Sequence, residues 1–355
     1  MQVISLFIAG GVGKRLWPKS DSFCPKQFSD FFCRNRTLIE ESISRMSFLT
    51  SLEDTFVVTD KKFESFFNNL NLQIPRENII YEPFGKNTSP AIELGLRIIR
   101  NKYGDDVVVA VLPCDHFIEK LPVFQNTILI ASEYAYEHDA IVTIGINPSE
   151  PNTNFGYIKK GGAINDSLFK VESFVEKPDL QKATMYLSSK QYFWNSGIYI
   201  FKLSTMMTKI AEKCPFQHSL FEGFNADSVI EENALLNIYN QLENVSIDKG
   251  VIEKCDNLFV VDGKFVWDDL GTWNSIEKYF PKDINKNVLG GGKHCLIYDC
   301  ENTSLISYDT KEIVLCGLDD VMVINANDKL LIIKKTDIEK IPVLIDELKK
   351  QENGK

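Results

Sequence analysis

An apolar segment of β type, Val3–Ala9, ends at the glycine-rich sequence Gly10–Gly13. Glycine reaches backbone conformations closed to other residues and lets a ligand approach the main chain closely. Successive backbone N–H groups in such a loop can cradle an anion. Lys14, Arg15 and, a little further on, Lys26 add positive charge to the same segment. The start of the chain therefore predicts a strand followed by a phosphate-binding loop.

Two better-known phosphate loops do not fit this segment. A P-loop ending in Gly13-Lys14 would require glycine at position 8 and a hydroxyl residue at position 15, where the chain has Ile8 and Arg15. A dinucleotide fingerprint beginning at Gly11 would require glycine at position 16, which is Leu16. A glycine turn at a strand end, without any ligand, is the alternative interpretation of the short motif.

Strand-like and helix-like segments alternate through the first half of the chain. The expected strands are Val3–Ala9, Thr55–Thr59, Val107–Leu112 and Ala140–Ile146. The expected helices are Thr37–Phe48, Lys61–Asn68, Ser89–Lys102 and Val123–Glu137. This alternation is typical of βαβ units, and the continuous apolar strands predict a sheet covered on both faces. The pattern loosens from 150 to 280, where we expect a mixed extension of the same sheet that carries a second ligand. The expected strands there are Phe155–Lys159, Leu168–Phe174, Gly197–Phe201 and Asn257–Val261, and the expected helices are Leu180–Ser188, Ser204–Lys213 and Glu231–Gln241.

A polar segment containing proline, Phe280–Asn287, marks the expected domain boundary. It predicts a catalytic domain over residues 1–280 and a C-terminal β-rich domain over residues 285–355. Short strands separated by turns indicate a small β-roll or solenoid, with strands at His294–Tyr298, Ser304–Ser307, Ile313–Cys316, Val321–Asn325 and Leu330–Lys334. A helix over Asp337–Lys350, with one apolar stripe, closes the chain.

Composition narrows the class of protein. A chain of 355 residues suits one large domain with a smaller one. The net charge of −10 argues against a nucleic-acid partner. The longest apolar run, Val107–Leu112, is far too short to cross a membrane, and no leader pattern opens the sequence. Eight cysteines without a Cys-x-x-Cys pair favour reduced thiols, so we expect a soluble cytoplasmic protein without a membrane partner.

Asp115 is placed as a metal ligand would be, whereas for Asp269 only the family resemblance described below implies that role. Asp115 follows the buried strand Val107–Leu112, and ligands of open α/β sheets lie outside the carboxyl ends of strands. Asp269 stands in the segment Trp267–Trp273. Mg²⁺ prefers a few carboxylates together with phosphate oxygens. A helix N-cap is the alternative role for Asp115, and a solvated acidic turn is the alternative for Asp269 and its neighbour Asp268.

The longer sequence Gly10–Pro18, followed by Pro25–Phe28, closely resembles the signature of sugar-1-phosphate nucleotidyltransferases, and within them the guanylyltransferase branch. Lys14 stands where that branch commonly has Ser or Thr. Further motifs resembling those of the family occur in family order over residues 4–277. The resemblance implies a Rossmann-like nucleotidyltransferase (GT-A-like) mixed α/β sheet flanked by helices, with a small C-terminal β-roll or β-helix-like domain.

The resemblance also implies a role for each matching residue. Catalytic roles fall to Arg15, Lys26 and Lys177, and metal binding falls to Asp115 and Asp269. Nucleotide contacts fall to Ala9, Gly10, Gly11, Gly13, Lys14, Glu82, Asn87 and Thr88. Sugar contacts fall to Gly156, Glu176, Asn195 and Asp248. Lys249 and Gly250, next to Asp248, depart from the family pattern.

The implied reaction joins GTP to a sugar 1-phosphate, with mannose 1-phosphate expected, and releases pyrophosphate with the help of Mg²⁺. The attacking phosphate is already an anion, so the reaction needs alignment and charge neutralisation rather than a strong base. The alternatives are a uridylyl or thymidylyl transferase, a guanylyltransferase for a heptose 1-phosphate, or a non-catalytic regulatory subunit that binds nucleotide sugars. The resemblance further implies a homodimer.

Overall fold

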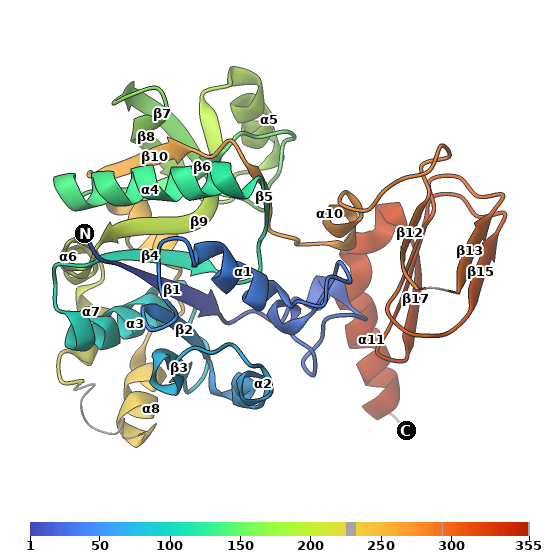
Figure 1. Ribbon diagram of the computed structural model, residues 1–355, viewed down its shortest axis with the longest axis horizontal. Coiled ribbons are helices and arrows are strands. Elements are labelled where there is room, and N and C mark those ends of the chain that lie inside the picture. Colours follow the sequence, from blue (N-terminus) through green and yellow to red (C-terminus); the bar gives the residue numbers. More distant parts are fainter. Residues whose placement is uncertain (225–231, 293, 354–355) are drawn as a thin grey trace. The chain divides into compact units, whose positions relative to one another are not determined.

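The computed structural model describes residues 1–224, 232–292 and 294–353, and the chain forms two compact units (Figure 1). Unit 1 comprises Met1–Gly10, Ile43–Cys114 and Ile118–Trp267. Unit 2 comprises Gly11–Ser42, Asp115–Phe117 and Asp268–Lys355. Residues 11–13 of the glycine-rich loop are therefore grouped with the C-terminal residues. This grouping by contact differs from the functional division expected near 280–285, which stays a prediction.

Within the described residues of unit 1, nine strands form one mixed sheet in the order β3-β2-β1-β4-β9-β6-β10-β8-β7. The strands are β1 (Val3–Ala9), β2 (Thr55–Asp60), β3 (Ile79–Glu82), β4 (Val108–Pro113), β6 (Ile141–Ile146), β7 (Tyr157–Ala163), β8 (Leu168–Val175), β9 (Tyr192–Lys202) and β10 (Leu258–Asp262). The first four are parallel, whereas β9 runs antiparallel to β4 and β6. The carboxyl ends of the parallel strands thus share one edge, as ligand-binding α/β sheets require.

Helices cover the sheet of unit 1 (Figure 1). Side chains of α3 and α6 pack in one apolar core with Ile4, Leu6 and Val109, while α4 packs on the opposite face against β4, β6 and β9. The helices of the chain up to residue 250 are α1 (Leu38–Met46), α2 (Glu64–Asn69), α3 (Thr88–Tyr103), α4 (Leu121–His138), α5 (Leu180–Ser189), α6 (Leu203–Lys213), α7 (Pro215–Phe221), α8 (Glu232–Gln241) and α9 (Ile247–Gly250). The predicted mixed α/β sheet, flanked by helices, is confirmed.

In unit 2, parallel strands stack as the coils of a small solenoid. Strands β12 (Val288–Gly291), β14 (Ser304–Ser307) and β16 (Val321–Ala326) form one stack, and β13 (Cys295–Tyr298) pairs in parallel with β15 (Ile313–Cys316). Strand β17 (Lys329–Lys334) closes the first stack antiparallel to β16. The predicted C-terminal β region is thereby confirmed.

Short elements complete the chain. Strands β5 (Phe117–Glu119) and β11 (Val266–Asp268) lie where the chain passes from one unit to the other. Helix α10 (Trp273–Glu277) follows, and a 3₁₀ segment, Lys335–Lys340, precedes the final helix α11 (Ile341–Asn353). The predicted helix Asp337–Lys350 therefore begins as a 3₁₀ turn.

Several predicted boundaries differ from those observed. Strand β9 covers Tyr192–Lys202 rather than Gly197–Phe201, because Gly197, with a φ of 71°, interrupts the apolar pattern without ending the strand. Strand β3 has too few residues for a pattern to show, and α7 was not predicted. The first residue of the predicted helix Glu231–Gln241 lies outside the described residues.

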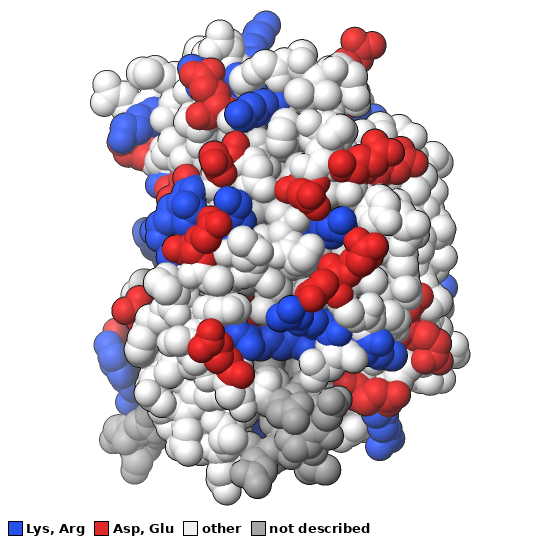
Figure 2. Space-filling model, turned by 90° about the vertical axis from the view of Figure 1, so that its left-hand side faces the viewer, with Lys and Arg blue, Asp and Glu red and all other residues white. Residues whose placement is uncertain are grey.

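The described residues contain no helix with the length and apolarity needed to cross a lipid bilayer. On the face drawn in Figure 2, basic and acidic side chains are interspersed, without a broad basic surface outside the grey atoms. A broad basic surface is the usual electrostatic feature of nucleic-acid binding.

Candidate active site

The glycine loop folds back onto Lys26. Gly13 has a φ of 73°, and a Cβ atom there would lie 2.6 Å from the Cβ of Lys26, so this position requires glycine. The carbonyl of Val12 accepts hydrogen bonds from the backbone N–H of Lys26 at 3.3 Å and from the hydroxyl of Ser20 at 2.6 Å. The loop and the lysine predicted to act with it are therefore one local structure.

Lys26 joins the two aspartates predicted to bind metal. The residue is 7% exposed, and its Nζ atom donates to Oδ2 of Asp115 at 2.7 Å and to the backbone carbonyl of Asp269. These residues are 89 and 243 positions away from Lys26 in the sequence. All three belong to unit 2. The fold thus assembles a lysine and two aspartates next to the glycine loop.

The two carboxylates have different electrostatic surroundings. Burial opposes ionisation of Asp115, but Lys26 and His116 outweigh it and hold the pKa of this carboxyl below its usual value. Burial raises the pKa of Asp269; Lys26 and His116 counteract this, whereas the charges of Asp268 and Asp115 add to it. Asp269 is therefore an incompletely compensated carboxylate, which an added cation would stabilise.

Asp268 and Asp269 are adjacent but have different roles in the turn. Asp268 accepts the backbone N–H of Leu270 at 2.7 Å and the hydroxyl of Tyr279 at 3.2 Å, so its two oxygens serve the local fold. One oxygen of Asp269 accepts the N–H of Gly271 at 3.1 Å. The preference for Asp269 as the metal ligand stays a prediction that these contacts support.

The donor set suits a divalent metal ion. Among the described residues, no cluster of three or more His, Cys, Asp or Glu side chains could hold a metal by itself. A magnesium ion commonly takes only one or two protein carboxylates and completes its shell with water and phosphate oxygens. Two carboxylates, Asp115 and Asp269, would be enough for such an ion, and their role as its ligands stays a prediction.

Lys14 and Arg15 lie on a 3₁₀ turn, Lys14–Leu16, directly after Gly13. Leu16 is buried, which anchors the turn, while Arg15 is half-buried and Lys14 is exposed. Within the part of the chain that the structure describes, neither cation forms an ion pair or a side-chain hydrogen bond. Both are therefore available to an anion at the loop.

The predicted sugar-binding residues cluster in unit 1. The backbone N–H of Asn195 donates to the carbonyl of Gly156 at 2.8 Å, and its amide group donates to Oδ1 of Asp248 at 3.1 Å. A Cβ atom at Gly156 would lie 2.6 Å from Oε2 of Glu176, so glycine leaves room for that carboxylate. Lys177, with a side chain 60% exposed, pairs with Glu176 at 3.0 Å.

Two further residues, Tyr199 and Thr143, hold these predicted sugar-binding residues in place. The buried hydroxyl of Tyr199 donates to Asp248 and accepts from the amide of Asn195 at 2.8 Å, and Thr143 donates to Oδ1 of Asn195 at 3.0 Å. Burial and the charge of Asp248 raise the pKa of Tyr199, which keeps it a donor. Sequence reasoning missed both, although the even spacing of Asn195 and Tyr199 along a strand places them on one face.

The segment predicted to meet the nucleoside is tied to the segment that carries Asp248. Asn87 caps α3 through the N–H of Thr88 at 3.0 Å, and its amide donates to Asn244 at 3.1 Å. The hydroxyl of Thr88 accepts the N–H of Ile247 at 2.9 Å. Direct contact of Asn87 and Thr88 with a base stays a prediction; the contacts present show that both residues also brace this part of unit 1.

The remaining predicted nucleotide residues lie at strand ends. Ala9 is buried at the end of β1, and its carbonyl accepts the hydroxyl of Thr59 at 2.8 Å. Gly10 and Gly11 follow it and are exposed. Glu82 ends β3 and is only 3% exposed.

Glu82 is a buried carboxyl with a raised pKa. Burial is the main cause and brings the pKa to about 7, against a hydrogen bond from the hydroxyl of Tyr239 at 3.0 Å; nearby Asp60 raises the pKa further and Lys62 lowers it. The folded state therefore takes up a proton at Glu82 more readily than the unfolded chain does.

Glu82→Gln is expected to stabilise the protein increasingly as the pH rises above the ordinary carboxyl pKa, with the full effect reached above about 7. A raised folded-state pKa gives stability that is complete below the ordinary carboxyl value and is lost as the pH rises through about 7. The variant avoids this loss, so its free energy of unfolding should exceed that of the wild type by up to about 3 kcal/mol near pH 8.5 and by little near pH 5. Urea unfolding across this range checks it, with the exposed Glu133→Gln as control. A difference independent of pH would contradict the prediction.

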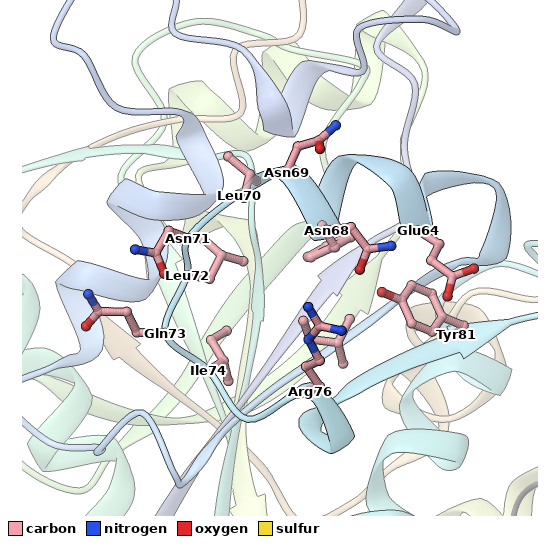
Figure 3. Close-up of a pocket in the computed structure, with 12 residues that line it drawn as sticks. Glu64, Asn68, Asn69, Leu70, Asn71, Leu72, Gln73, Ile74, Arg76 and Tyr81 are labelled. Atoms are coloured by element: carbon pink, nitrogen blue, oxygen red, sulfur yellow. The ribbon is translucent and has the colours of Figure 1, made fainter.

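A pocket of about 450 Å³ in unit 1 lies away from the residues predicted from the sequence (Figure 3). It surrounds the turn between α2 and β3 and is lined by Glu64, Phe67, Asn68, Asn69, Leu70, Asn71, Leu72, Gln73, Ile74, Arg76, Ile79 and Tyr81. Its lining is rich in neutral amides, with Arg76 and Glu64 of opposite charge. A triphosphate requires several cations, so this pocket is a poorer candidate than the Lys26 region.

Comparison with known proteins shows which protein family the chain belongs to. Residues 4–286 match the Nucleotidyl transferase family, and the chain belongs to that family of enzymes. Its relatives include the mannose-1-phosphate guanylyltransferase of Klebsiella pneumoniae, 32% identical over 99% of this chain and 75% of that protein. The mannose-1-phosphate guanylyltransferase of Escherichia coli is also 32% identical, over 99% of this chain and 74% of that protein.

A solved structure extends the similarity to the whole fold. The crystal structure of mannose-1-phosphate geranyltransferase from Thermus thermophilus aligns with a TM-score of 0.88 at 28% identity, over 98% of this chain and 100% of that chain. The family and the fold class predicted from the sequence are thereby confirmed.

Proposed function

We propose that this chain transfers the guanylyl group of GTP to mannose 1-phosphate, giving GDP-mannose and pyrophosphate. The observation that carries the proposal is the contact of Lys26 with both Asp115 and Asp269, beside a loop shaped by Gly13. The names of the relatives supply the base and the sugar.

Residues of unit 2 bind the triphosphate. The backbone N–H groups of Gly11 and Gly13, with the guanidinium of Arg15, hold the β- and γ-phosphates. Lys26 neutralises charge on the α-phosphate. Nucleotidyltransferases generally use a divalent metal ion, and here we propose Mg²⁺ held by Asp115 and Asp269. When bound, that ion neutralises phosphate charge.

Residues of unit 1 bind the second reactant. Asn195, Asp248 and Glu176 offer amide and carboxylate groups to sugar hydroxyls, and Tyr199 keeps the first two in a fixed orientation. Lys177 meets the sugar phosphate. Glu82, Asn87 and Thr88 are proposed to contact the nucleoside.

The reaction needs no proton transfer. An anionic oxygen of the sugar phosphate attacks the α-phosphorus of GTP, and the bond to the bridging oxygen breaks as pyrophosphate leaves with the electron pair. The barrier lies in bringing two anions together, and cations with correct alignment lower it. This accounts for a site built from lysine, arginine and carboxylates.

A substrate panel tests the proposal. Pyrophosphate release is measured for GTP, UTP, dTTP and ATP, each with mannose, glucose and heptose 1-phosphates, with and without Mg²⁺. We expect GTP with mannose 1-phosphate to be the fastest pair by at least about tenfold. If another pair reacts faster, that pair is assigned as the substrates in place of GTP and mannose 1-phosphate. Binding of GDP-mannose without any turnover would instead indicate the regulatory subunit.

The cytoplasmic location, the homodimer and the absence of nucleic-acid and membrane partners stay predictions. Size-exclusion chromatography with light scattering tests the homodimer.

A further inference from the structure

The hairpin turn between β16 and β17 reaches the segment that connects Arg15 to Lys26. Asn327 and Asp328 occupy its two central positions with φ angles of 54° and 58°, as type I′ turns require. The side-chain amide of Asn327 donates to the carbonyl of Pro18 at 2.9 Å and to that of Lys19 at 3.3 Å. Within this connecting segment the carbonyls of Leu16, Asp21 and Cys24 accept backbone N–H groups of the same segment, whereas the carbonyl of Pro18 accepts the amide of Asn327.

A second contact fixes the turn just before Lys26. Nζ of Lys329, on β17, lies 2.7 Å from Oδ2 of Asp21. The other oxygen of Asp21 accepts the N–H groups of Phe23 at 2.8 Å and Cys24 at 2.9 Å. Lys329 therefore holds the Asp21 carboxylate, which in turn binds the backbone of the two residues that precede Pro25.

Other side chains that follow position 270 bind this segment and the residues just beyond Lys26. The indole N–H of Trp273 donates to the carbonyl of Trp17 at 2.9 Å. The hydroxyl of Tyr308 donates to the carbonyl of Phe31 at 2.8 Å, and Nζ of Lys19 lies 4.2 Å from the centre of its ring. Helix α11 packs against the turn that carries Arg15. Residues 17–31 are thus held from several directions by residues that follow position 270.

We propose that Asn327 and Lys329 are positioning residues for the phosphate loop, through which the β-solenoid sets the placement of Arg15 and Lys26. Neither touches the reactants. They act on the backbone that separates the two cations. The catalytic consequence rests on the proposed function, because a cation misplaced by about 1 Å can cost about 10²-fold in rate.

The test compares matched variants of the full chain. Asn327→Gly removes the amide and keeps the positive φ, and its control Asp328→Gly makes the same change one residue later, where the side chain is 93% exposed. Lys329→Met removes the ion pair, and Lys329→Arg restores a cation. We expect kcat to fall about tenfold in Asn327→Gly and in Lys329→Met and to fall further in the double variant, with the KM for sugar phosphate unchanged. Asp328→Gly should match the wild type, and Lys329→Arg should recover most of the rate.

Hydrogen exchange of the free protein supplies a readout independent of catalysis. Backbone amides of residues 13–26 should exchange faster in the double variant than in the wild type or in Asp328→Gly. An unchanged kcat, or unchanged exchange in these amides, would overturn the proposal. If the wild type transfers no guanylyl group, the proposed function fails, and exchange alone decides whether the solenoid positions the loop.

Discussion

Lys26→Met is expected to lower the rate of pyrophosphate release from GTP and mannose 1-phosphate by about 10²–10³-fold. Methionine keeps most of the length of the side chain and removes its charge. The lost ammonium is the group that contacts both Asp115 and the carbonyl of Asp269, and in the proposed reaction it neutralises the α-phosphate. Steady-state kinetics with saturating Mg²⁺ measures the effect.

The control for this variant is Lys264→Met, which removes a lysine that is 65% exposed and lies 3.8 Å from Asp262. It should leave the rate unchanged. Circular dichroism of both variants verifies that the fold persists. This check is needed because Lys26→Met also removes the cation that pairs with the carboxylate of Asp115. Turnover by Lys26→Met within about tenfold of the wild type would remove Lys26 from the catalytic machinery.

Asp115→Asn and Asp269→Asn are each expected to weaken metal binding strongly. Loss of groups that merely support metal ligands typically costs about 10–100-fold in affinity, so loss of a ligand should cost at least as much. The concentration of Mg²⁺ that gives half-maximal rate should rise accordingly. Direct titration with Mn²⁺, followed by electron paramagnetic resonance in the presence of a non-hydrolysable GTP analogue, separates binding from turnover.

Asp256→Asn serves as the control for the metal titration, because this aspartate is 89% exposed and belongs to unit 1, whereas Asp115 and Asp269 belong to unit 2. If both Asp115→Asn and Asp269→Asn bind Mn²⁺ like the wild type, neither carboxylate is a metal ligand. If only one of them loses affinity, the proposed pair reduces to a single ligand.

Features encoded in short stretches of sequence could be predicted. The apolar run before Gly10 predicted β1 with its observed ends, and the glycine at position 13 predicted a conformation that the structure shows. Asp115 was recognisable because it follows a buried strand, and position at a strand end does not depend on distant residues. Local patterns of this kind also predicted the alternation of strands and helices in the first half of the chain.

Features that depend on contacts between distant residues could not be predicted. Tyr199 resembled a core aromatic residue, and only the folded chain shows its hydroxyl on Asp248. Thr143 and Asn327 belong to no motif, yet each hydrogen-bonds a segment that is 52 or more positions away. The grouping of residues 11–42 with the C-terminal part likewise arises from packing, which hydrophobic periodicity does not record.

The hydrogen bonds from Asn327 to Pro18 and Lys19 span more than 300 positions of the chain. A ribosome makes the chain from its amino terminus, so Pro18 and Lys19 emerge long before the amide that their carbonyls bind. The hydrogen bonds that Asn327 supplies to this segment can therefore form only after residue 327 has been synthesised.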